Sequence, residues 1–270
     1  MKKKNVLITV LKGLWIGGTM TVPGISGGSM AMILGIYDRL ITAINHAVRL
    51  DKKSILYLME FVAGSVVGLV LFSKSLLHLL EKYPMPMQYF FLGCVVGGAP
   101  MIFRTAQVKK FNWKTIAYPL IGILCVYLIS LLPAGLFSAE ANQGIGGIAI
   151  QLLGGLVIAI ALVLPGISVS QMLLMLGLYE EVMTAISTLH ILPILPLGIG
   201  VLIGVLLTAK GMEQAMEKIP EFTYLAVFGF IIGSIPELFP GVPYGWNIPL
   251  CLLMAAAGFF AIYFVTQKEG

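Results

Sequence analysis

A Pro-Gly-Ile-Ser tetrapeptide occurs twice in the chain, at residues 23–26 and 165–168. In both copies the serine stands just before an apolar run, where a helix N-cap residue is expected. A helix that begins there offers backbone N–H groups without intrahelical acceptors and a partial positive charge. Such groups favour an anion, phosphate above all. Two of these helix ends facing each other would form one anion cradle.

The expected phosphate ligands come from both copies of the motif and their neighbours: Ser26, Gly27, Gly28, Ser29, Ser168, Ser170 and Gln171. Glycines let the backbone come close to a ligand. Arg39 is the one cation close to either motif, and we expect it to be the charge partner of the phosphate. The alternative is a tight turn whose small residues only serve helix packing. Repetition of the motif at equivalent positions favours the functional interpretation.

Other residues are expected to shape these segments or to couple transport to an energy source. The shaping residues are Pro23, Gly24, Gly35, Tyr37, Pro165, Gly166, Gly177 and Tyr179. Ionisable residues at membrane depth are costly and are functional candidates. The coupling candidates are Asp38, Glu60 and Glu180. For Asp38 and Glu180, a role in holding the segment is an equal alternative.

The motifs belong to a longer internal repeat. Residues 23–44 and 165–186 share 11 identities in 22 positions at an offset of 142. The similarity resumes at an offset of 136, where Gly68 matches Gly204 and Gly93 matches Gly229. The chain therefore reads as two homologous halves, residues 1–138 and 139–270.

The composition indicates whether the chain lies in water or in a membrane. Hydrophobic residues make up 59% and charged residues 11% of its 270 residues, and the mean hydropathy is +0.98. A soluble domain carries roughly a quarter charged residues, so a soluble globular protein is excluded, and so is a disordered chain. The basic residues lie in short clusters between apolar runs, which argues against a nucleic-acid partner. We expect an all-α polytopic membrane protein.

Each half is expected to begin with a re-entrant or broken helical hairpin, followed by three transmembrane helices. The hairpins are expected at residues 6–48 and 148–187. The helices are expected at 55–72, 88–104 and 115–133, and at 193–209, 222–238 and 247–266. Three crossings per half is an odd number, so the repeats would be inverted relative to each other. Two complete kinked helices joined by a loop are the alternative to each hairpin.

The distribution of Lys and Arg tests this layout. With a cytoplasmic N-terminus, fourteen basic residues, Lys12 included, fall inside and only Lys74 and Lys82 fall outside, with Arg39 ambiguous. We therefore expect both termini to be cytoplasmic.

No enzymatic motif supports a catalytic function. The chain has no HExxH or Walker A pattern, so we expect no metal, no cofactor, no enzymatic activity and no direct use of ATP. The membrane potential or a proton gradient would then bias transport. The alternatives from other classes are a small-anion exporter or channel that uses the same cradle, and a membrane enzyme acting on lipid phosphates.

The paired segments PGISGGSMAMILGIYDRLI and LPGISVSQMLLMLGLYEEV resemble the polyprenyl-phosphate transporter (PopT) family over nearly the whole chain. The resemblance implies a multi-pass protein of the bacterial plasma membrane that returns undecaprenyl phosphate from the outer to the inner leaflet, recycling the lipid carrier of envelope polymers. Its implied partners are this lipid and the bilayer, and whether the chain forms a homo-oligomer is left open. The sequence departs from the family pattern at Val169, where the second motif usually has Gly.

Overall fold

The computed structural model describes residues 3–20, 25–108, 111–133, 135, 144–188 and 190–267. These residues form helices joined by short connections and contain no strand. Seven of the described helical segments are long and apolar enough to cross a membrane. The prediction of an all-helical polytopic membrane protein is therefore confirmed for the described residues.

Each half begins with three helices, of which the second and third are short, and we call these two sets the first and second triplets. The first triplet is α1 (Lys3–Thr19), α2 (Gly27–Ile33) and α3 (Tyr37–Ala47), and the second is α7 (Gly144–Val163), α8 (Val169–Leu176) and α9 (Tyr179–Ser187). The turns after α2 and α8 contain Gly35 and Gly177, with φ of 67° and 74°. This left-handed conformation is strained for residues with a Cβ, so the two glycines end the short helices at matching places.

Further helices follow each triplet. In the first half they are α4 (Lys52–Lys82), α5 (Pro84–Thr105) and α6 (Trp113–Ser130). In the second half the short 3₁₀ helix η2 (Leu192–Ile194) leads into α10 (Leu195–Lys218), α11 (Pro220–Gly233), α12 (Ile235–Leu238) and α13 (Asn247–Gln267). The candidate spans also include residues 146–163 of α7, whereas the apolar part of α1, Val6–Thr19, is shorter.

Three of the expected helix ranges differ from the structure. The helix expected at 193–209 continues to Lys218 as α10. The helix expected at 55–72 continues to Lys82 because the residues after Phe72 are still good helix formers. Its 31 residues rise about 46 Å at 1.5 Å per residue, more than the ~30 Å of a hydrocarbon core. The helix expected at 222–238 is interrupted at Ser234, two residues before Pro236, because proline has no N–H to donate to a continuing helix.

The helices pack in pairs that repeat between the halves. Helix α1 packs on α4 as α7 packs on α10, while α5 packs on α13 and α6 on α11. Glycines allow close backbone contact in each pair. A Cβ added at Gly64 would lie 2.3 Å from the carbonyl oxygen of Val10, and one added at Gly200 would lie 2.3 Å from that of Leu152. Gly64 and Gly200 are 136 residues apart, and Val10 and Leu152 are 142 residues apart, which are the two offsets of the repeat.

The pairs α5–α13 and α6–α11 join the two halves. A Cβ added at Gly93 would lie 2.0 Å from the carbonyl oxygen of Ala255, and one at Gly229 would lie 2.0 Å from that of Pro119. Gly229 is the repeat counterpart of Gly93, and Ala255 is that of Pro119, each 136 residues later in the chain. The glycine belongs to the first half in one contact and to the second half in the other. Each half therefore supplies one helix that packs against the other half.

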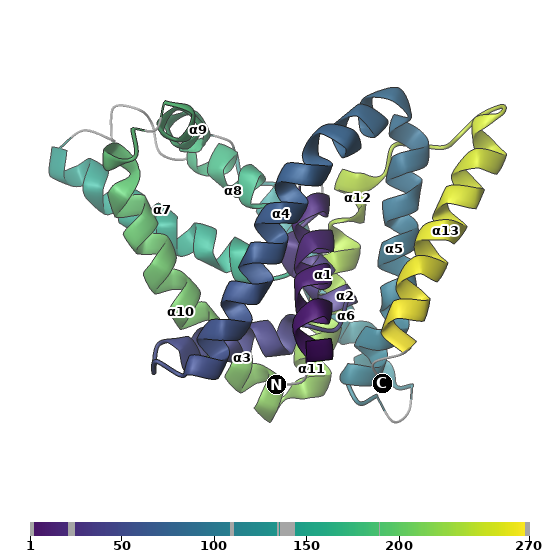
Figure 1. Ribbon diagram of the computed structural model, residues 1–270, viewed down its shortest axis with the longest axis horizontal. Coiled ribbons are helices and arrows are strands. Elements are labelled where there is room, and N and C mark those ends of the chain that lie inside the picture. The colour runs from purple at the N-terminus through teal and green to yellow at the C-terminus, as the bar shows by residue number, and fades with distance from the viewer. Residues whose placement is uncertain are drawn as a thin grey trace.

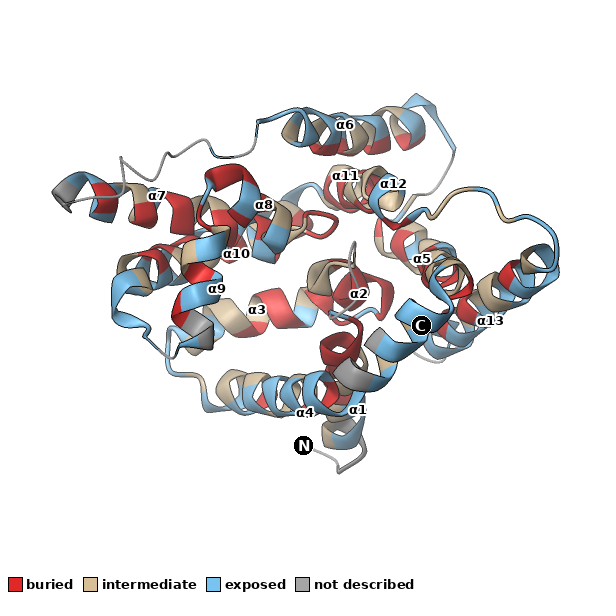
Figure 2. Cartoon of the chain, turned by 90° about the horizontal axis from the view of Figure 1, so that it is seen from above, coloured by how far each residue is buried: buried red, intermediate tan, exposed pale blue. Residues whose placement is uncertain are grey.

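The triplets enter the molecule from different ends. In Figure 1, α3 lies at the end where the N-terminus is marked, and α9 lies at the opposite end. Seen from above, α2, α3 and α8 lie inside a ring of longer helices, and α4, α6 and α13 present many exposed residues on the outside (Figure 2). The exposed residues of these outer helices are largely apolar, including Val66, Leu124 and Leu253, as expected of surfaces that face lipid.

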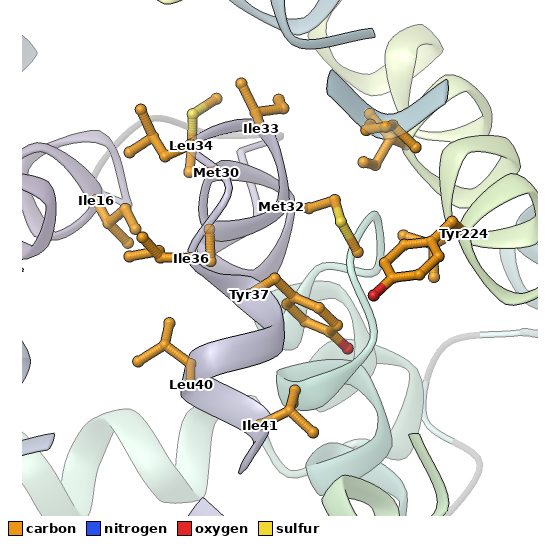
Figure 3. Packing of buried hydrophobic residues seen from close by; sticks show 14 of the residues in the cluster. Ile16, Met30, Met32, Ile33, Leu34, Ile36, Tyr37, Leu40, Ile41 and Tyr224 are labelled. Carbon is orange, nitrogen blue, oxygen red and sulfur yellow. The ribbon is translucent and has the colours of Figure 1, made fainter. Parts of the chain in front are cut away.

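The main hydrophobic core forms around the first triplet. It includes Ile16 of α1, residues 30–33 of α2, Tyr37, Leu40 and Ile41 of α3, and Tyr224 of α11 (Figure 3). Because α2 and α3 are buried inside the bundle, the start of α2 at Gly27 lies next to the centre of the protein.

Candidate functional site

A cavity of about 280 Å³ lies between the two triplets, and we call it the central cavity. Residues from both triplets line it together with single residues of α4 and α10: Ile16, Met20, Ile25, Ser26, Gly27, Gly28, Ala31, Tyr37, Leu40, Ile41, Ile44, Phe61, Ala161, Leu162, Val163, Ile167, Ser168, Val169, Ser170 and Val205. The polar groups are serine hydroxyls, one tyrosine and backbone, and the rest of the lining is apolar. Among the described residues no charged side chain lines it.

The two serines of the repeated motif stand at the starts of short helices. Ser26 is the N-cap residue of α2, with φ −89° and ψ 134°, and its side chain makes no capping hydrogen bond. Ser168 is the N-cap residue of α8, and its Oγ accepts a long hydrogen bond of 3.4 Å from the N–H of Gln171. The first N–H groups of α2 have no acceptor within the helix. Hydroxyl and N–H donors are thus available where the two motifs meet.

The two triplets are in direct contact beside these serines. A Cβ added at Gly28 would lie 3.3 Å from the Cα of Pro165. The hydroxyl of Tyr37 donates a hydrogen bond of 2.9 Å to the carbonyl oxygen of Val163, the last residue of α7. The start of α2 and the Pro165 segment after α7 are therefore in contact.

The structure brings together five of the expected phosphate ligands. Ser26, Gly27 and Gly28 of the first half and Ser168 and Ser170 of the second half all line the central cavity. Of the shaping residues, Tyr37 lines this cavity, Pro165 is buried beside it, and Gly166 (φ 84°) packs against the backbone of Phe230. Tyr179 begins α9 and is half-buried. Pro23 and Gly24 lie outside the described residues.

Three expected ligands do not line the central cavity. The buried Ser29 points to a much smaller adjacent cavity that Ser26 and Ser234 also line, and its hydroxyl has no hydrogen-bond partner among the described residues. The side chain of Gln171 hydrogen-bonds Glu237. Neither residue is oriented as the sequence predicted.

Arg39 is also oriented away from the central cavity. Its guanidinium carbon lies 4.1 Å from the centroid of the Tyr57 ring on α4. Tyr37 and Arg39 are two residues apart on α3, which sets them about 200° apart around a helix with 3.6 residues per turn. Because Tyr37 faces the cavity, Arg39 faces α4 instead, so the structure does not support Arg39 as the charge partner in the central cavity.

The coupling candidates occupy different environments. Asp38 accepts a hydrogen bond of 2.7 Å from the hydroxyl of Tyr224, and burial raises the pKa of its carboxyl group, which belongs to none of the seven candidate spans. One oxygen of Glu60, Oε2, is buried without a hydrogen-bond partner among the described residues. Glu180 is exposed in the first turn of α9. Asp38 and Glu60 are therefore better placed than Glu180 to respond to events inside the protein.

Lys12 is a candidate that the sequence analysis missed, since it was counted among the cytoplasmic residues. It is buried in α1, 6% exposed, and its Nζ donates a hydrogen bond of 2.8 Å to the carbonyl oxygen of Leu34 at the end of α2. It lies one turn before Ile16, which lines the central cavity. A lysine inside an apolar run was the available signal, because a buried cation in a membrane protein is usually functional. Lys12 supplies positive charge close to the central cavity.

These features define a site that could bind an anion without a metal. Among the described residues, no group of three or more His, Cys, Asp or Glu side chains could hold a metal ion. The donors come from backbone and hydroxyl groups of both triplets, and a largely apolar lining lowers the local dielectric constant, which strengthens hydrogen bonds to an anion.

Comparison with known families gives the family of the chain. The model of the undecaprenyl phosphate translocase-like (VCA0040-like) family matches residues 16–243, which include all the residues that line the central cavity. The chain belongs to this family.

Two relatives of this chain carry the name "Polyprenyl-phosphate transporter". The one from Vibrio cholerae is 28% identical over 257 residues, covering 88% of this chain and 79% of its own length. The one from Staphylococcus aureus is 32% identical over 246 residues, covering 87% of each chain. No solved structure matches this chain.

Proposed function

We propose that this chain carries a polyprenyl phosphate, undecaprenyl phosphate in particular, from the outer to the inner leaflet of a bacterial plasma membrane. The observation that carries the proposal is the central cavity, to which both Pro-Gly-Ile-Ser segments contribute hydroxyl groups and backbone. Its family and the names of its relatives support this substrate. The lipid would leave chemically unchanged, so the protein would be a translocase and not an enzyme.

The phosphate would be bound by the donors at the two breaks. We infer that Ser26 and Ser168, with the N–H groups of Gly27 and Gly28, donate hydrogen bonds to its oxygens. Helix α2 has only seven residues, so its dipole adds little and the individual N–H and hydroxyl groups supply most of the interaction. The buried charge of Lys12 would compensate part of the negative charge of the phosphate. The prenyl tail would remain in lipid, because the outer helices present apolar surface.

We further propose that the two halves are inverted repeats and that the triplets are re-entrant hairpins whose breaks meet at the middle of the membrane. The paired glycine contacts at matching positions support a two-fold relation between the halves. The location of α3 and α9 at opposite ends supports the inversion (Figure 1). Both termini would be cytoplasmic. One site between two inverted hairpins could then open alternately to each leaflet, as in other transporters built from inverted repeats.

Direction would come from the membrane potential or a proton gradient. Asp38, hydrogen-bonded to Tyr224 of the other half, is the first candidate for a proton that binds and leaves during the cycle. Glu60 is the second, since one of its carboxylate oxygens is buried without a hydrogen-bond partner among the described residues.

Purified protein in liposomes tests the proposal. A fluorescent polyprenyl phosphate added to one leaflet should become inaccessible to a membrane-impermeant quencher much faster in proteoliposomes than in empty liposomes, without release of inorganic phosphate. Ser26→Ala with Ser168→Ala should slow this step by at least tenfold, and Ser130→Ala, at an exposed position on α6, should not. Flux of small anions without lipid movement would support an exporter or channel, and released phosphate would support an enzyme.

A further inference from the structure

A second cavity of about 280 Å³, which we call the Arg39 pocket, lies beside α3 on the side away from the central cavity. It is lined by Arg39, Thr42, Ala43, Lys53, Ser54 and Tyr57. Two of these six residues are cations, and three carry hydroxyl groups. We propose that the Arg39 pocket binds the terminal phosphate monoester of the lipid after it leaves the central cavity, as a release site; this inference rests on the proposed function.

The guanidinium group of Arg39 is held in place while its donors stay available. Its carbon lies 4.1 Å from the centre of the Tyr57 ring, a cation–π contact that fixes the group without using its N–H donors. None of the described carboxylates forms an ion pair with Arg39. A planar guanidinium with free donors binds phosphate oxygens in pairs, and an ammonium such as that of Lys53 adds a point charge.

Nearby carboxylates are engaged elsewhere. Asp38, the neighbour of Arg39 in α3, accepts a hydrogen bond of 2.7 Å from the hydroxyl of Tyr224. Asp51 caps α4 and accepts hydrogen bonds from the N–H and the Oγ of Ser54, at 3.0 and 2.6 Å. These bonds turn the Asp51 carboxylate toward the helix end, which leaves Arg39 and Lys53 as the charges that line the pocket.

The two cavities lie on opposite faces of one helix. Tyr37, Leu40, Ile41 and Ile44 of α3 line the central cavity, while Arg39, Thr42 and Ala43 line the Arg39 pocket. Both sets follow the spacing of one helix face. On α4, Phe61 lines the first cavity and Tyr57 the second, and these residues are one turn apart, about 6 Å along the helix axis. A phosphate could therefore pass between the cavities along the α3–α4 contact.

The matching end of the second half has the opposite charge. Glu180 and Glu181 occupy the positions of Asp38 and Arg39 in the repeat, and Glu181 accepts a hydrogen bond of 2.7 Å from Gln151. An anion is attracted at the end of the molecule near α3 and repelled at the end near α9. This asymmetry in an otherwise repeated structure gives a direction to the movement of the phosphate, toward the end of the N-terminus.

Photo-crosslinking of the reconstituted full-length protein tests the Arg39 pocket. The probe is a polyprenyl phosphate with a photoreactive group next to the phosphate, and the labelled peptides are mapped by mass spectrometry. In the wild-type protein we expect labels both in residues 25–34 and 167–176 and in residues 39–57. Arg39→Gln with Lys53→Gln should reduce labelling of residues 39–57 at least tenfold and keep the central labels, which also report a correct fold. Lys52→Gln, an exposed lysine outside the pocket, should leave both sets unchanged.

Several results would overturn the release site. It falls if residues 39–57 are not labelled in the wild-type protein while the central segments are, or if the double variant is labelled as the wild type is. It also falls if excess phosphatidylglycerol, a phosphate diester, removes the label from residues 39–57 as efficiently as unlabelled prenyl phosphate does, because the pocket would then bind anionic lipid in general. Loss of the central labels in the wild-type protein would instead contradict the proposed function.

Discussion

The hydroxyl of Tyr37 donates a hydrogen bond of 2.9 Å to the carbonyl oxygen of Val163, and this bond joins the first triplet to the second. Both residues are buried, with exposed fractions of 3% and 4%. Val163 is the last residue of α7 and lies two residues before Pro165. Because the helix ends there, no N–H group of a further helical turn donates a hydrogen bond to the Val163 carbonyl. Tyr37 therefore satisfies a backbone group that the break in the second triplet leaves without a partner.

Replacing Tyr37 with Phe should weaken the contact between the triplets. The variant leaves the Val163 carbonyl buried without a donor, which costs about 1–3 kcal/mol of unfolding free energy. We expect a lower thermal stability in detergent and slower lipid movement in liposomes. Tyr179→Phe is the matched control, since Tyr179 is the repeat counterpart and its hydroxyl makes no hydrogen bond to the described residues. Equal stability of the two variants would show that the bond does not hold the triplets together.

Gly28 should not tolerate a side chain. A Cβ there would lie 3.3 Å from the Cα and 3.4 Å from the nitrogen of Pro165, and backbone atoms cannot move away as a flexible side chain can. Gly28→Ala should therefore separate the two breaks by a few tenths of an ångström and weaken prenyl phosphate binding several-fold, measured by displacement of a fluorescent analogue.

Gly211→Ala provides the control for this experiment. Nothing lies within 4 Å of a Cβ added at Gly211, which is in α10. Alanine is favoured over glycine inside a helix by about 1 kcal/mol, so this variant should be at least as stable as the wild type. Unchanged binding in Gly28→Ala would contradict the importance of close contact at the breaks.

Asp38 and Asp51 should give stability a pH dependence of opposite sign. Burial raises the pKa of Asp38, so the folded protein binds this proton more tightly than the unfolded chain does. The contribution of Asp38 to stability therefore falls as the pH rises from the unfolded to the folded pKa of the group. Hydrogen bonds from Ser54 lower the pKa of Asp51, so its contribution is present at neutral pH and is lost as the pH falls.

Thermal unfolding between about pH 3.5 and 7 measures both effects. The stability of Asp38→Asn relative to the wild type should increase as the pH rises, and that of Asp51→Asn should decrease. The same trend in both variants, or no trend in either, would contradict the environments assigned to the two carboxylates.

The repeated motif predicted where the short helices α2 and α8 begin, because its physical meaning is local. A Pro-Gly pair ends one helix, and the serine that follows begins another, so the position of Ser26 and Ser168 at helix starts could be read from the sequence. Their convergence followed from the repeat itself. The direction of the Arg39 side chain could not be predicted from the sequence. The turn at Gly35 separates α2 from α3, so the faces of α3 do not continue those of α2.

Other differences come from tertiary packing. Pro100 and Pro236 are repeat counterparts, yet α5 continues through the first proline, whereas the chain breaks before the second. Lys12 was interpreted as a cytoplasmic charge because its partner, the carbonyl oxygen of Leu34, is 22 residues away in the sequence. A single sequence contains the charge but not the neighbour that keeps it inside the protein.

The inversion of the halves predicts opposite accessibility of two exposed positions. Lys52 begins α4 and Glu180 lies in the first turn of α9, at opposite ends of the molecule. Single cysteines at these positions, in a variant without Cys94, Cys125 and Cys251, should react differently with a membrane-impermeant thiol reagent added outside cells. We expect labelling at position 180 and none at position 52 until the membrane is permeabilised. Labelling of both from the same side would make the repeats parallel.

The location of the bound lipid phosphate tests the central claim most directly. We propose a structure determination by cryo-electron microscopy of the full-length protein in nanodiscs with undecaprenyl phosphate. The account predicts phosphate density in the central cavity, within hydrogen-bonding distance of Ser26 and Ser168 and of the first N–H groups of α2. A bound phosphate found elsewhere, the Arg39 pocket included, with no head-group density between the two Pro-Gly-Ile-Ser segments in any class of particles, would contradict it.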